Sequence, residues 1–317
     1  MIKHVVSVSG GKDSTATLLI ALDRCPPGSV VPIFCDTGNE HQAVHNYLGY
    51  LEQALDIQIH RLKADFREQL AAKRRFIARD TRTGRAPDGR KVRWSNKGKR
   101  RALAVLHPSG NPFLDLCMLK GRFPSSAAQF CTSELKRDPA VEFQLDLVDA
   151  GHRVVSWQGI RRDESINRRF KPKFERIGPG MRVCRPIIDW SAEQVFALAK
   201  ARGIAPNPLY MQGMGRVGCM PCINCRKADL RQIAVRFPDH IERIAEWERV
   251  VSACSKRGSS TFFPASHADQ DVREVFTVSG IRNRVEWSKT TRGGRQFDLL
   301  QVLDEPNTCS SIYGLCE

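Results

Sequence analysis

The first 62 residues alternate between short β-branched segments and segments that favour helix, and this alternation restricts the fold more than any other feature. Buried strands are predicted over residues 4–9, 30–35 and 57–62, and helices over residues 15–22 and 40–55. Strands that alternate with helices in this way pair in parallel, and the helices cover the faces of the sheet. The sequence therefore predicts an α/β fold with a Rossmann-like parallel sheet.

Later segments continue the pattern, with a strand predicted over residues 153–158 and helices over residues 139–150, 191–203 and 227–254. Ser191 and Gln194 form a capping box at the start of one helix, and Pro238 should interrupt the last one. Residues 206–218 are rich in glycine and proline and suggest a linker. Residues 255–317 favour no particular element.

The turn after the first strand is the most specific local signal. This glycine loop lies between a predicted strand and a predicted helix, and it consists of Ser9, Gly10, Gly11, Lys12, Asp13 and Ser14. Its glycines let backbone amides approach a ligand, the helix N-terminus adds a positive dipole, and the lysine adds a full charge. The sequence therefore predicts a phosphate-binding loop here.

Two further sets of polar residues follow predicted strands. Asp36 ends the second strand, where it could bind Mg²⁺ or a nucleotide hydroxyl, or simply cap the turn. Arg161, Arg162 and Arg168 follow the strand at residues 153–158, and they could clamp phosphate or form a solvated basic surface.

The positive charge of the chain is concentrated in one stretch. Fifty basic against 34 acidic residues give a net charge of +16, and residues 61–101 hold 16 basic and 4 acidic side chains, or +12 of it. Such a stretch binds phosphate polyanions or forms a solvated face, and charge alone favours neither. Because Gly84, Pro87 and Gly89 interrupt it, we expect a loop-rich insertion.

Membrane and secretory signals are weak in this sequence. The longest nearly apolar run, residues 16–22, is far shorter than the ~20 residues that cross a bilayer. The first residues lack the apolar stretch and cleavage site of a secretory signal. We therefore expect a cytoplasmic protein without membrane contacts.

The eleven cysteines of a cytoplasmic chain indicate metal or redox chemistry rather than disulfides. Cys219, Cys222 and Cys225 have the spacing of bacterial ferredoxin ligands, which favours an iron–sulfur site and leaves zinc as the alternative. Cys309 and Cys316 stand near the last residue, where they could be reactive or inert thiols.

Five segments in a fixed order carry a resemblance to a known family. They are residues 9–14, 34–40 (Phe-Cys-Asp-Thr-Gly-Asn-Glu), 130–139 (Phe-Cys-Thr-Ser-Glu-Leu-Lys-Arg-Asp-Pro), 159–168 (Gly-Ile-Arg-Arg-Asp-Glu-Ser-Ile-Asn-Arg) and 217–222 (Val-Gly-Cys-Met-Pro-Cys). Together they resemble the PP-loop ATP pyrophosphatases, in the branch of the PAPS reductases, the ATP sulfurylase small subunits and the PP-loop proteins of DNA phosphorothioate modification.

The resemblance implies an adenine nucleotide alpha hydrolase-like fold in which the glycine loop binds ATP with Mg²⁺. It implies nucleotide contacts from Ser9 to Ser14, Asp36 and Arg168, and catalytic roles for Lys12, Asp13, Arg161 and Arg162. Sulfonucleotide reductases usually lack the Lys-Asp pair of this loop. The chain is therefore similar to the members that bind and cleave ATP.

The resemblance also implies a [4Fe-4S] cluster bound by Cys131, Cys219, Cys222 and Cys225, with Cys309 or Cys316 as other possible fourth ligands. Cluster-bearing reductases have a Cys-Cys pair where this chain has Phe130 and Cys131. Reductases of the family carry a reactive cysteine near the carboxyl terminus, and Cys316 is similar to it in position, which implies a catalytic role.

These observations predict an ATP-dependent sulfurtransferase that acts on an adenylated substrate, nucleic acid in our interpretation, held by residues 61–101. A sulfur donor such as a cysteine desulfurase would be a partner. One alternative is a sulfonucleotide (APS or PAPS) reductase that releases sulfite, and another is a non-catalytic nucleic-acid-binding module with zinc. We expect a nucleotide-binding domain over residues 1–215, and a smaller, cysteine-rich, mostly helical region over residues 216–317.

Overall fold

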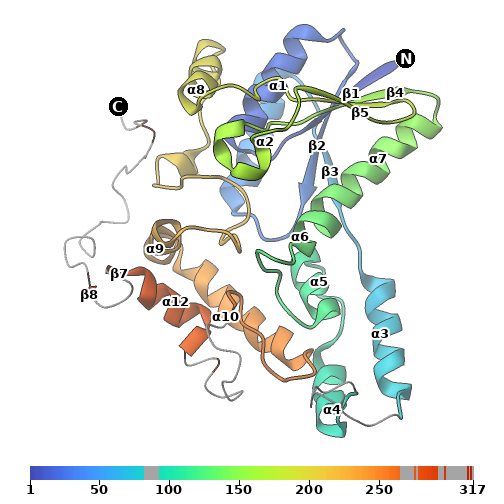
Figure 1. Cartoon of the computed structure of the whole chain (residues 1–317), viewed down its shortest axis with the longest axis vertical. Helices are drawn as coiled ribbons and strands as arrows, with labels where there is room; N and C mark the ends of the chain where they lie inside the picture. The colour runs from blue at the N-terminus through green and yellow to red at the C-terminus, as the bar shows by residue number, and fades with distance from the viewer. Residues whose placement is uncertain are drawn as a thin grey trace.

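A six-stranded sheet forms the upper part of the molecule in Figure 1. The structure is a computed structural model that describes residues 1–81, 93–264 and 278–291 and the positions 275, 296, 297, 313 and 315. Its strand order is β3-β2-β1-β4-β6-β5, with bounds Ile2–Ser7 (β1), Val30–Asp36 (β2), His60–Lys63 (β3), Arg153–Trp157 (β4), Phe174–Gly178 (β5) and Met181–Cys184 (β6). All neighbours pair in parallel except β5, which runs antiparallel to β6 at the edge. The predicted Rossmann-like α/β fold is confirmed.

Helices cover both faces of this sheet. One face packs on α1 (Lys12–Arg24), α2 (Gln42–Leu55) and α8 (Ala192–Ala201), and the other on α7 (Asp138–Asp149). Neighbouring residues of β1 show the alternation: Val6 belongs to the large core of the first face, whereas Val5 packs with Phe143 of α7. The strands and helices predicted for the first 62 residues are therefore present, with shifts of a few residues at their ends.

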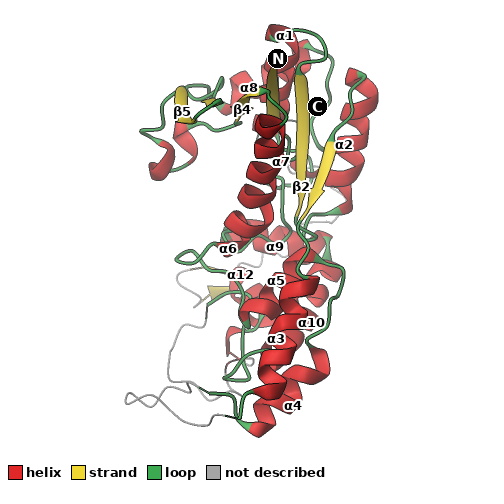
Figure 2. Cartoon of the chain, turned by 90° about the vertical axis from the view of Figure 1, so that its right-hand side faces the viewer, coloured by secondary structure: helices red, strands yellow, loops and turns green. Residues whose placement is uncertain are grey.

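A helical part lies beyond the carboxyl ends of the parallel strands (Figures 1 and 2). It consists of α3 (Arg67–Arg79), α4 (Asn96–Val105), α5 (Pro112–Lys120), α9 (Lys227–Arg236), α10 (Pro238–Ala253) and α12 (Ile281–Ser288). A single hydrophobic core runs from the sheet into this part, and it includes Phe113, Trp247 and Phe262. Short elements complete the described chain: α6 (Phe130–Thr132), η1 (Ser133–Arg137), η2 (Arg162–Glu164), η3 (Ile166–Arg168), η4 (Pro208–Tyr210), β7 (Thr290–Thr291) and β8 (Gln296–Phe297).

Local capping signals set several helix ends as the sequence predicts. Ser191 accepts a hydrogen bond from the Gln194 amide, and the Gln194 side chain accepts one from the Ser191 amide, so the capping box at α8 is confirmed. Gly203, just after this helix, has a φ of +66°, a backbone conformation that glycine adopts easily. Pro238 separates α9 from α10.

The expectation of a loop-rich insertion over residues 61–101 is wrong for its described part, because α3 and the first half of α4 lie there. Several of its cations bind carbonyl groups at helix ends rather than facing solvent. Lys73 donates to the carbonyls of Met118 and Leu119 at 3.0 and 2.7 Å, in the last turn of α5. Carbonyls in the last turn of a helix lack the regular helical partner, and Lys73 gives these two a charged donor.

Arg74 and Arg101 act in the same way as Lys73. Arg74 donates to the Leu103 and Leu106 carbonyls at the end of α4, at 2.7 and 3.0 Å, and Arg101 to the Ala253 carbonyl of α10 at 3.1 Å. These three cations of the basic stretch thus join helices, and the polyanion site predicted for the stretch stays a prediction. Residues 82–92 of the insertion lie outside the described part of the chain.

Among the described residues, no helix combines the length and apolar character needed to cross a bilayer.

Replacing Lys73 with methionine tests the structural role of these cations. The Lys73→Met variant should lose about 1.5–3 kcal/mol of unfolding free energy, because two buried carbonyls lose a charged donor. Arg75, an exposed neighbour on α3, is the matched control, and Arg75→Met should change stability by less than about 0.5 kcal/mol. Urea unfolding measures both values, and equal losses would contradict the assignment.

Candidate functional site

The glycine loop connects β1 to α1 at the carboxyl edge of the sheet. Gly10 has a φ of +72°, which turns the chain sharply into the helix. The hydroxyl of Ser14 accepts a hydrogen bond from the Ser9 amide at 3.0 Å and donates to the Gly11 carbonyl at 2.9 Å. These bonds fix the loop around the first turn of the helix, as a phosphate-binding loop requires.

Asp13 joins the glycine loop to the loop that follows β4. Its carboxylate accepts a hydrogen bond from Arg161 Nε at 2.6 Å and lies 3.3 Å from Lys12 Nζ. The Arg161 side chain is only 6% exposed. Burial lowers the pKa of Arg161, but the carboxylates of Asp13 and Asp163 outweigh it and raise that pKa overall. The predicted residues Lys12, Asp13 and Arg161 therefore form one buried ionic group.

The two loops touch through their backbones at Gly159. A Cβ atom at this position would lie 2.7 Å from the Asp13 carbonyl oxygen and 3.0 Å from the Ser14 nitrogen. Cβ atoms in proteins essentially never lie under 3.0 Å from another heavy atom, so the close contact of the two loops requires glycine at this position. Gly159 thus sets how closely the loop after β4 approaches the glycine loop, in addition to any role in turning its own backbone.

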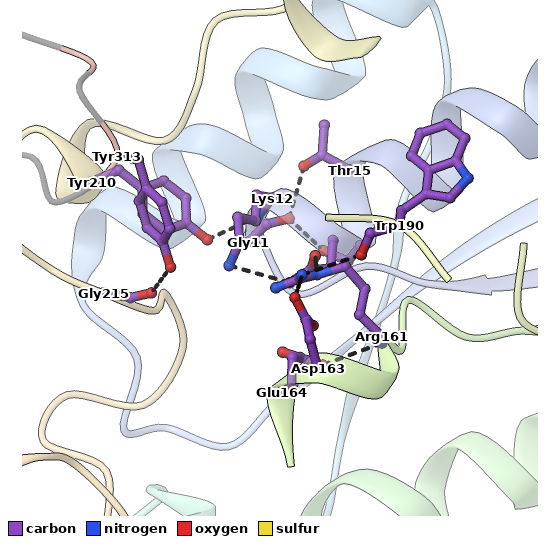
Figure 3. A network of polar contacts seen from close by, with 12 residues as sticks. Gly11, Lys12, Thr15, Arg161, Asp163, Glu164, Trp190, Tyr210, Gly215 and Tyr313 are labelled. Atoms are coloured by element: carbon purple, nitrogen blue, oxygen red, sulfur yellow. Dashed lines mark hydrogen bonds and ion pairs between the residues drawn. The ribbon is translucent and has the colours of Figure 1, made fainter. Parts of the chain in front are cut away.

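Two tyrosines flank Lys12 on its other side (Figure 3). The Tyr210 hydroxyl accepts a hydrogen bond from the Lys12 amide at 2.9 Å, and Asn207 donates to the Gly10 carbonyl at 3.1 Å. Lys12 Nζ lies 5.7 Å from the ring centre of Tyr210 and 5.0 Å from that of Tyr313. The expectation that residues 206–218 form a mere linker is therefore wrong, because this segment supports the glycine loop.

A cavity of about 400 Å³ opens beside the loop. Among its lining residues are Ser9, Gly11, Lys12, Asp13, Ser14, Glu40, Lys136, Gly159, Glu164, Arg168, Tyr210, Arg216 and Gly218. Burial, then the positive charge of Arg216, lowers the pKa of Arg168, although Glu164 forms an ion pair with it. Two arginines that repel each other at a cavity are favourable partners for an anion.

A third cation, Lys136, reaches the cavity from η1. The charge of Cys219 raises its pKa, burial opposes this, and Glu40 raises it further. Glu40 in turn accepts a hydrogen bond from the Thr37 hydroxyl at 2.7 Å, and its carboxylate lies 3.6 Å from the Cys219 sulfur. Lys136 therefore connects the cavity to the cysteine segment.

Hydrogen bonds to the loop after β2 hold the cysteine segment, residues 219–225, in place. Asn39 accepts from the Met220 amide at 2.7 Å and donates through its side chain to the Pro221 carbonyl at 2.9 Å. Arg243 of α10 donates to both the Asn39 side chain and the Met220 carbonyl at 2.9 Å. The segment is thus attached to the sheet and to the helical part together.

Three of the four predicted metal ligands lie near the fourth, Cys222. Its charge acts on Cys131, Cys219 and Cys225, and burial raises the pKa of Cys131 and raises those of Cys219 and Cys225 to about 12. No three histidine, cysteine or acidic side chains of the described residues are close enough together to hold a metal ion. The donors fit a cluster in their chemistry, since a buried lysine stands beside them to offset thiolate charge. Binding one would require the thiols to move closer together.

Asp36 and Arg162 are predicted site residues that lie outside the cavity lining. Asp36 accepts a hydrogen bond from the Gly38 amide at 2.9 Å, so it caps its own turn. Arg162 forms an ion pair with Asp189 and donates to the Lys171 carbonyl. Cys309 and Cys316 lie outside the described residues. The roles given to all four stay predictions.

Several residues that shape the cavity are not among the predicted site residues, namely Glu40, Lys136, Gly159, Asn207, Tyr210 and Arg216. Three of them lie inside the segments that carry the family resemblance, namely Glu40, Lys136 and Gly159, so those segments contain a signal for them. Asn207 followed by proline is a signal for the short helix η4, where the Asn207 side chain accepts from the Leu209 amide. No local pattern predicts that Tyr210 lies against the glycine loop.

Comparison with known proteins gives a family match over most of the chain. The profile of the phosphoadenosine phosphosulfate reductase domain matches residues 3–225. A protein of Escherichia phage 186, described as an uncharacterized 37.8 kDa protein, is 47% identical over 325 residues, covering 99% of this chain and 96% of its own length.

Two reductases show more limited similarity. An adenosine 5'-phosphosulfate reductase of Neisseria meningitidis is 36% identical over 115 residues, which is 34% of this chain and 44% of that enzyme. The crystal structure of the phosphoadenylyl-sulfate reductase from Candida auris, a phosphate complex, aligns with a TM-score of 0.41 and 15% identity over 69% of this chain and 82% of its own. A structural likeness this distant says nothing about the ligand.

Replacing Gly159 with alanine tests the contact of the two loops. The new methyl group must push the β4 loop away from Asp13, so nucleotide affinity should fall by at least about tenfold. Gly49 of α2 has open space around it, and the control Gly49→Ala should keep affinity and raise stability by up to about 1 kcal/mol. Calorimetric titration with ATP measures the effect, and unchanged affinity in Gly159→Ala would disprove the role of the contact.

Proposed function

Because the chain belongs to the phosphoadenosine phosphosulfate reductase domain family, a family of nucleotide-binding PP-loop enzymes, we propose that it is an ATP pyrophosphatase-type sulfurtransferase. In this proposal it binds ATP with Mg²⁺, adenylates an oxygen of a nucleic acid and exchanges that oxygen for sulfur. The observation that carries the proposal is the cavity beside the glycine loop, which joins Lys12 and Asp13 to the cationic side chains of Lys136, Arg168 and Arg216.

The cations around the cavity suit a triphosphate better than a single phosphate ester. Backbone amides of the glycine loop and the N-terminus of α1 would receive the β- and γ-phosphates. Arg168 and Arg216 would stand on the side of the α-phosphate and offset the charge that grows there. Asp13 keeps Lys12 and Arg161 in place and so fixes this arrangement before the ligand arrives.

The reaction would proceed in two displacement steps. A substrate oxygen attacks the α-phosphorus of ATP. The bond between the α-phosphorus and the oxygen that bridges it to the β-phosphorus breaks, and pyrophosphate leaves with the electron pair of that bond. The substrate oxygen is then part of an AMP ester, so a sulfur nucleophile can displace AMP. A sulfur donor such as a cysteine desulfurase would supply the sulfur as sulfide, or as a persulfide whose S–S bond a second thiol cleaves after AMP has left, so that the thiolated substrate is released and a disulfide remains.

In this proposal the cysteine segment takes part in the sulfur transfer. Cys219, Cys222 and Cys225 would hold a [4Fe-4S] cluster with Cys131 as the fourth ligand, and if only the first three bind, the fourth iron would be free to hold sulfide. Lys136 stands between these thiols and the cavity, where its charge stabilises anions on both sides. Burial raises the pKa of the Cys219 and Cys225 thiols and so keeps them protonated, and loading of the cluster must release their protons.

A reductase acting on adenosine 5'-phosphosulfate or its 3'-phosphate is the second candidate. The match to adenosine 5'-phosphosulfate reductases favours it, although the matched stretch spans 44% of the Neisseria enzyme. Such an activity would release sulfite without ATP and would need a reactive thiol, for which Cys316 is the candidate.

Single turnover of ATP labelled in the α-phosphate tests the proposal. The wild-type protein should form AMP and pyrophosphate only when nucleic acid is present. Arg168→Gln should slow this by about 100-fold, because the variant lacks a cation at the α-phosphate. Arg202, which forms an ion pair with Asp23 outside the cavity lining, is the control, and Arg202→Gln should retain the rate. Sulfite release without ATP would instead favour the second candidate.

Metal analysis after anaerobic purification tests the cysteine site. The wild-type protein should be brown and contain iron and acid-labile sulfide in equal amounts. Cys222→Ser should lose both, because Cys222 lies among the other three thiols, whereas Cys25→Ser, a half-buried thiol of another region, should keep them. Colourless protein with bound zinc would contradict the cluster and support the zinc alternative.

A further inference from the structure

Large apolar side chains are exposed on a short segment beside the cavity. Residues 166–177, which we call the aromatic–basic segment, run from η3 into the edge strand β5. Phe170 is 87% exposed and Phe174 67% exposed, and neither ring contacts another ring within the described residues. Figure 2 shows β5 on the outside of the molecule, at one end of the sheet. Exposed apolar groups of this size indicate a binding surface rather than a core.

Cations surround these two phenylalanines. The segment contains five basic residues, Arg168, Arg169, Lys171, Lys173 and Arg176, and one acidic residue, Glu175. Glu175 forms an ion pair with Arg185 from outside the segment, at 2.8 Å. In the part of the chain that the structure describes, the side chains of Arg169, Lys171, Lys173 and Arg176 form no hydrogen bond or ion pair. The segment therefore presents free positive charge next to free aromatic rings.

We infer that the aromatic–basic segment binds single-stranded nucleic acid, with bases stacked on Phe170 and Phe174 and phosphates held by the four free cations. Base stacking on exposed rings together with a track of positive charge is how proteins bind single strands without sequence preference. A duplex keeps its bases stacked on each other, so it cannot use the rings. The charge of the segment argues against an apolar protein partner, which would leave the cations without counterions.

The segment leads directly into the cavity. Arg168, the first of its basic residues, lines the cavity, and Phe170 follows two residues later. A strand bound here would pass the site at which ATP is proposed to react, so this inference rests on the proposed function for its purpose. It also relocates the nucleic acid, which the sequence analysis assigned to residues 61–101, where Lys73, Arg74 and Arg101 bind helix carbonyls instead.

Binding of short fluorescein-labelled oligothymidine and oligouridine, measured by anisotropy without ATP, tests the inference. Phe170→Ala/Phe174→Ala should weaken binding by about tenfold or more, because each ring that is removed takes away the support of one stacked base. Phe76 of α3, 52% exposed within the basic insertion, is the matched control, and Phe76→Ala should bind as the wild type does. Near-UV circular dichroism and thermal unfolding confirm that each variant is folded.

The dependence of binding on salt separates phosphate binding from stacking. Arg169→Gln/Lys171→Gln should reduce the slope of log affinity against log salt by about 0.7 for each phosphate that the variant no longer binds. Phe170→Ala/Phe174→Ala should leave this slope unchanged. Wild-type affinity for a duplex of the same length should be lower than for either single strand.

Three outcomes would overturn the inference. They are equal binding by the phenylalanine variant and the wild type, a larger decrease in Phe76→Ala, and a preference of the wild type for duplex. The proposed function is tested by a different result. Strand binding without formation of AMP would contradict the proposed function and leave this inference standing. ATP cleavage that requires only a small nucleotide acceptor would contradict nucleic acid as the substrate in the proposed function.

Discussion

The ion pair between Asp13 and Arg161 is the interaction on which the site depends. β1 and β4 are neighbours in the sheet, so the loops that follow them meet at the same edge. Asp13 on one loop binds Arg161 from the other at 2.6 Å, and Gly159 lets the two backbones touch. Lys12 also pairs with Asp13 and Asp163 also pairs with Arg161, so four charged side chains hold the two loops together. The cavity therefore keeps its shape without ligand.

Positive charge serves three purposes in this molecule, and position decides which. Lys73, Arg74 and Arg101 bind carbonyl groups at helix ends, where they join helices. Arg168 and Arg216 meet at the cavity, and their repulsion prepares it for an anion. The four free cations of the aromatic–basic segment form no ion pair in the described structure. The net charge of +16 therefore combines cations that have different structural and functional roles.

The cysteine segment is attached to the cavity from two directions. Glu40 and Asn39, after β2, contact Cys219 and Met220, and Arg243 of α10 reaches the same loop. Lys136 adds an electrostatic link, since its pKa responds to Cys219 on one side while its side chain lines the cavity on the other. Nucleotide and sulfur chemistry would thus share one set of charges, which is the basis of the proposed function.

The amino-acid sequence was enough to predict β1 to β4, the helices that cover them and the glycine loop, but not β5 and β6, because hydrophobic period, caps and glycine turns are local signals that neighbouring residues satisfy. It also identified Lys12, Asp13 and Arg161. Only the tertiary structure decided that Tyr210 supports the loop, that Lys73 caps a helix, and that Phe170 stays exposed. These depend on contacts between residues far apart in the chain, and a charge or a ring looks the same in the sequence whether it meets a carbonyl, a carboxylate or water.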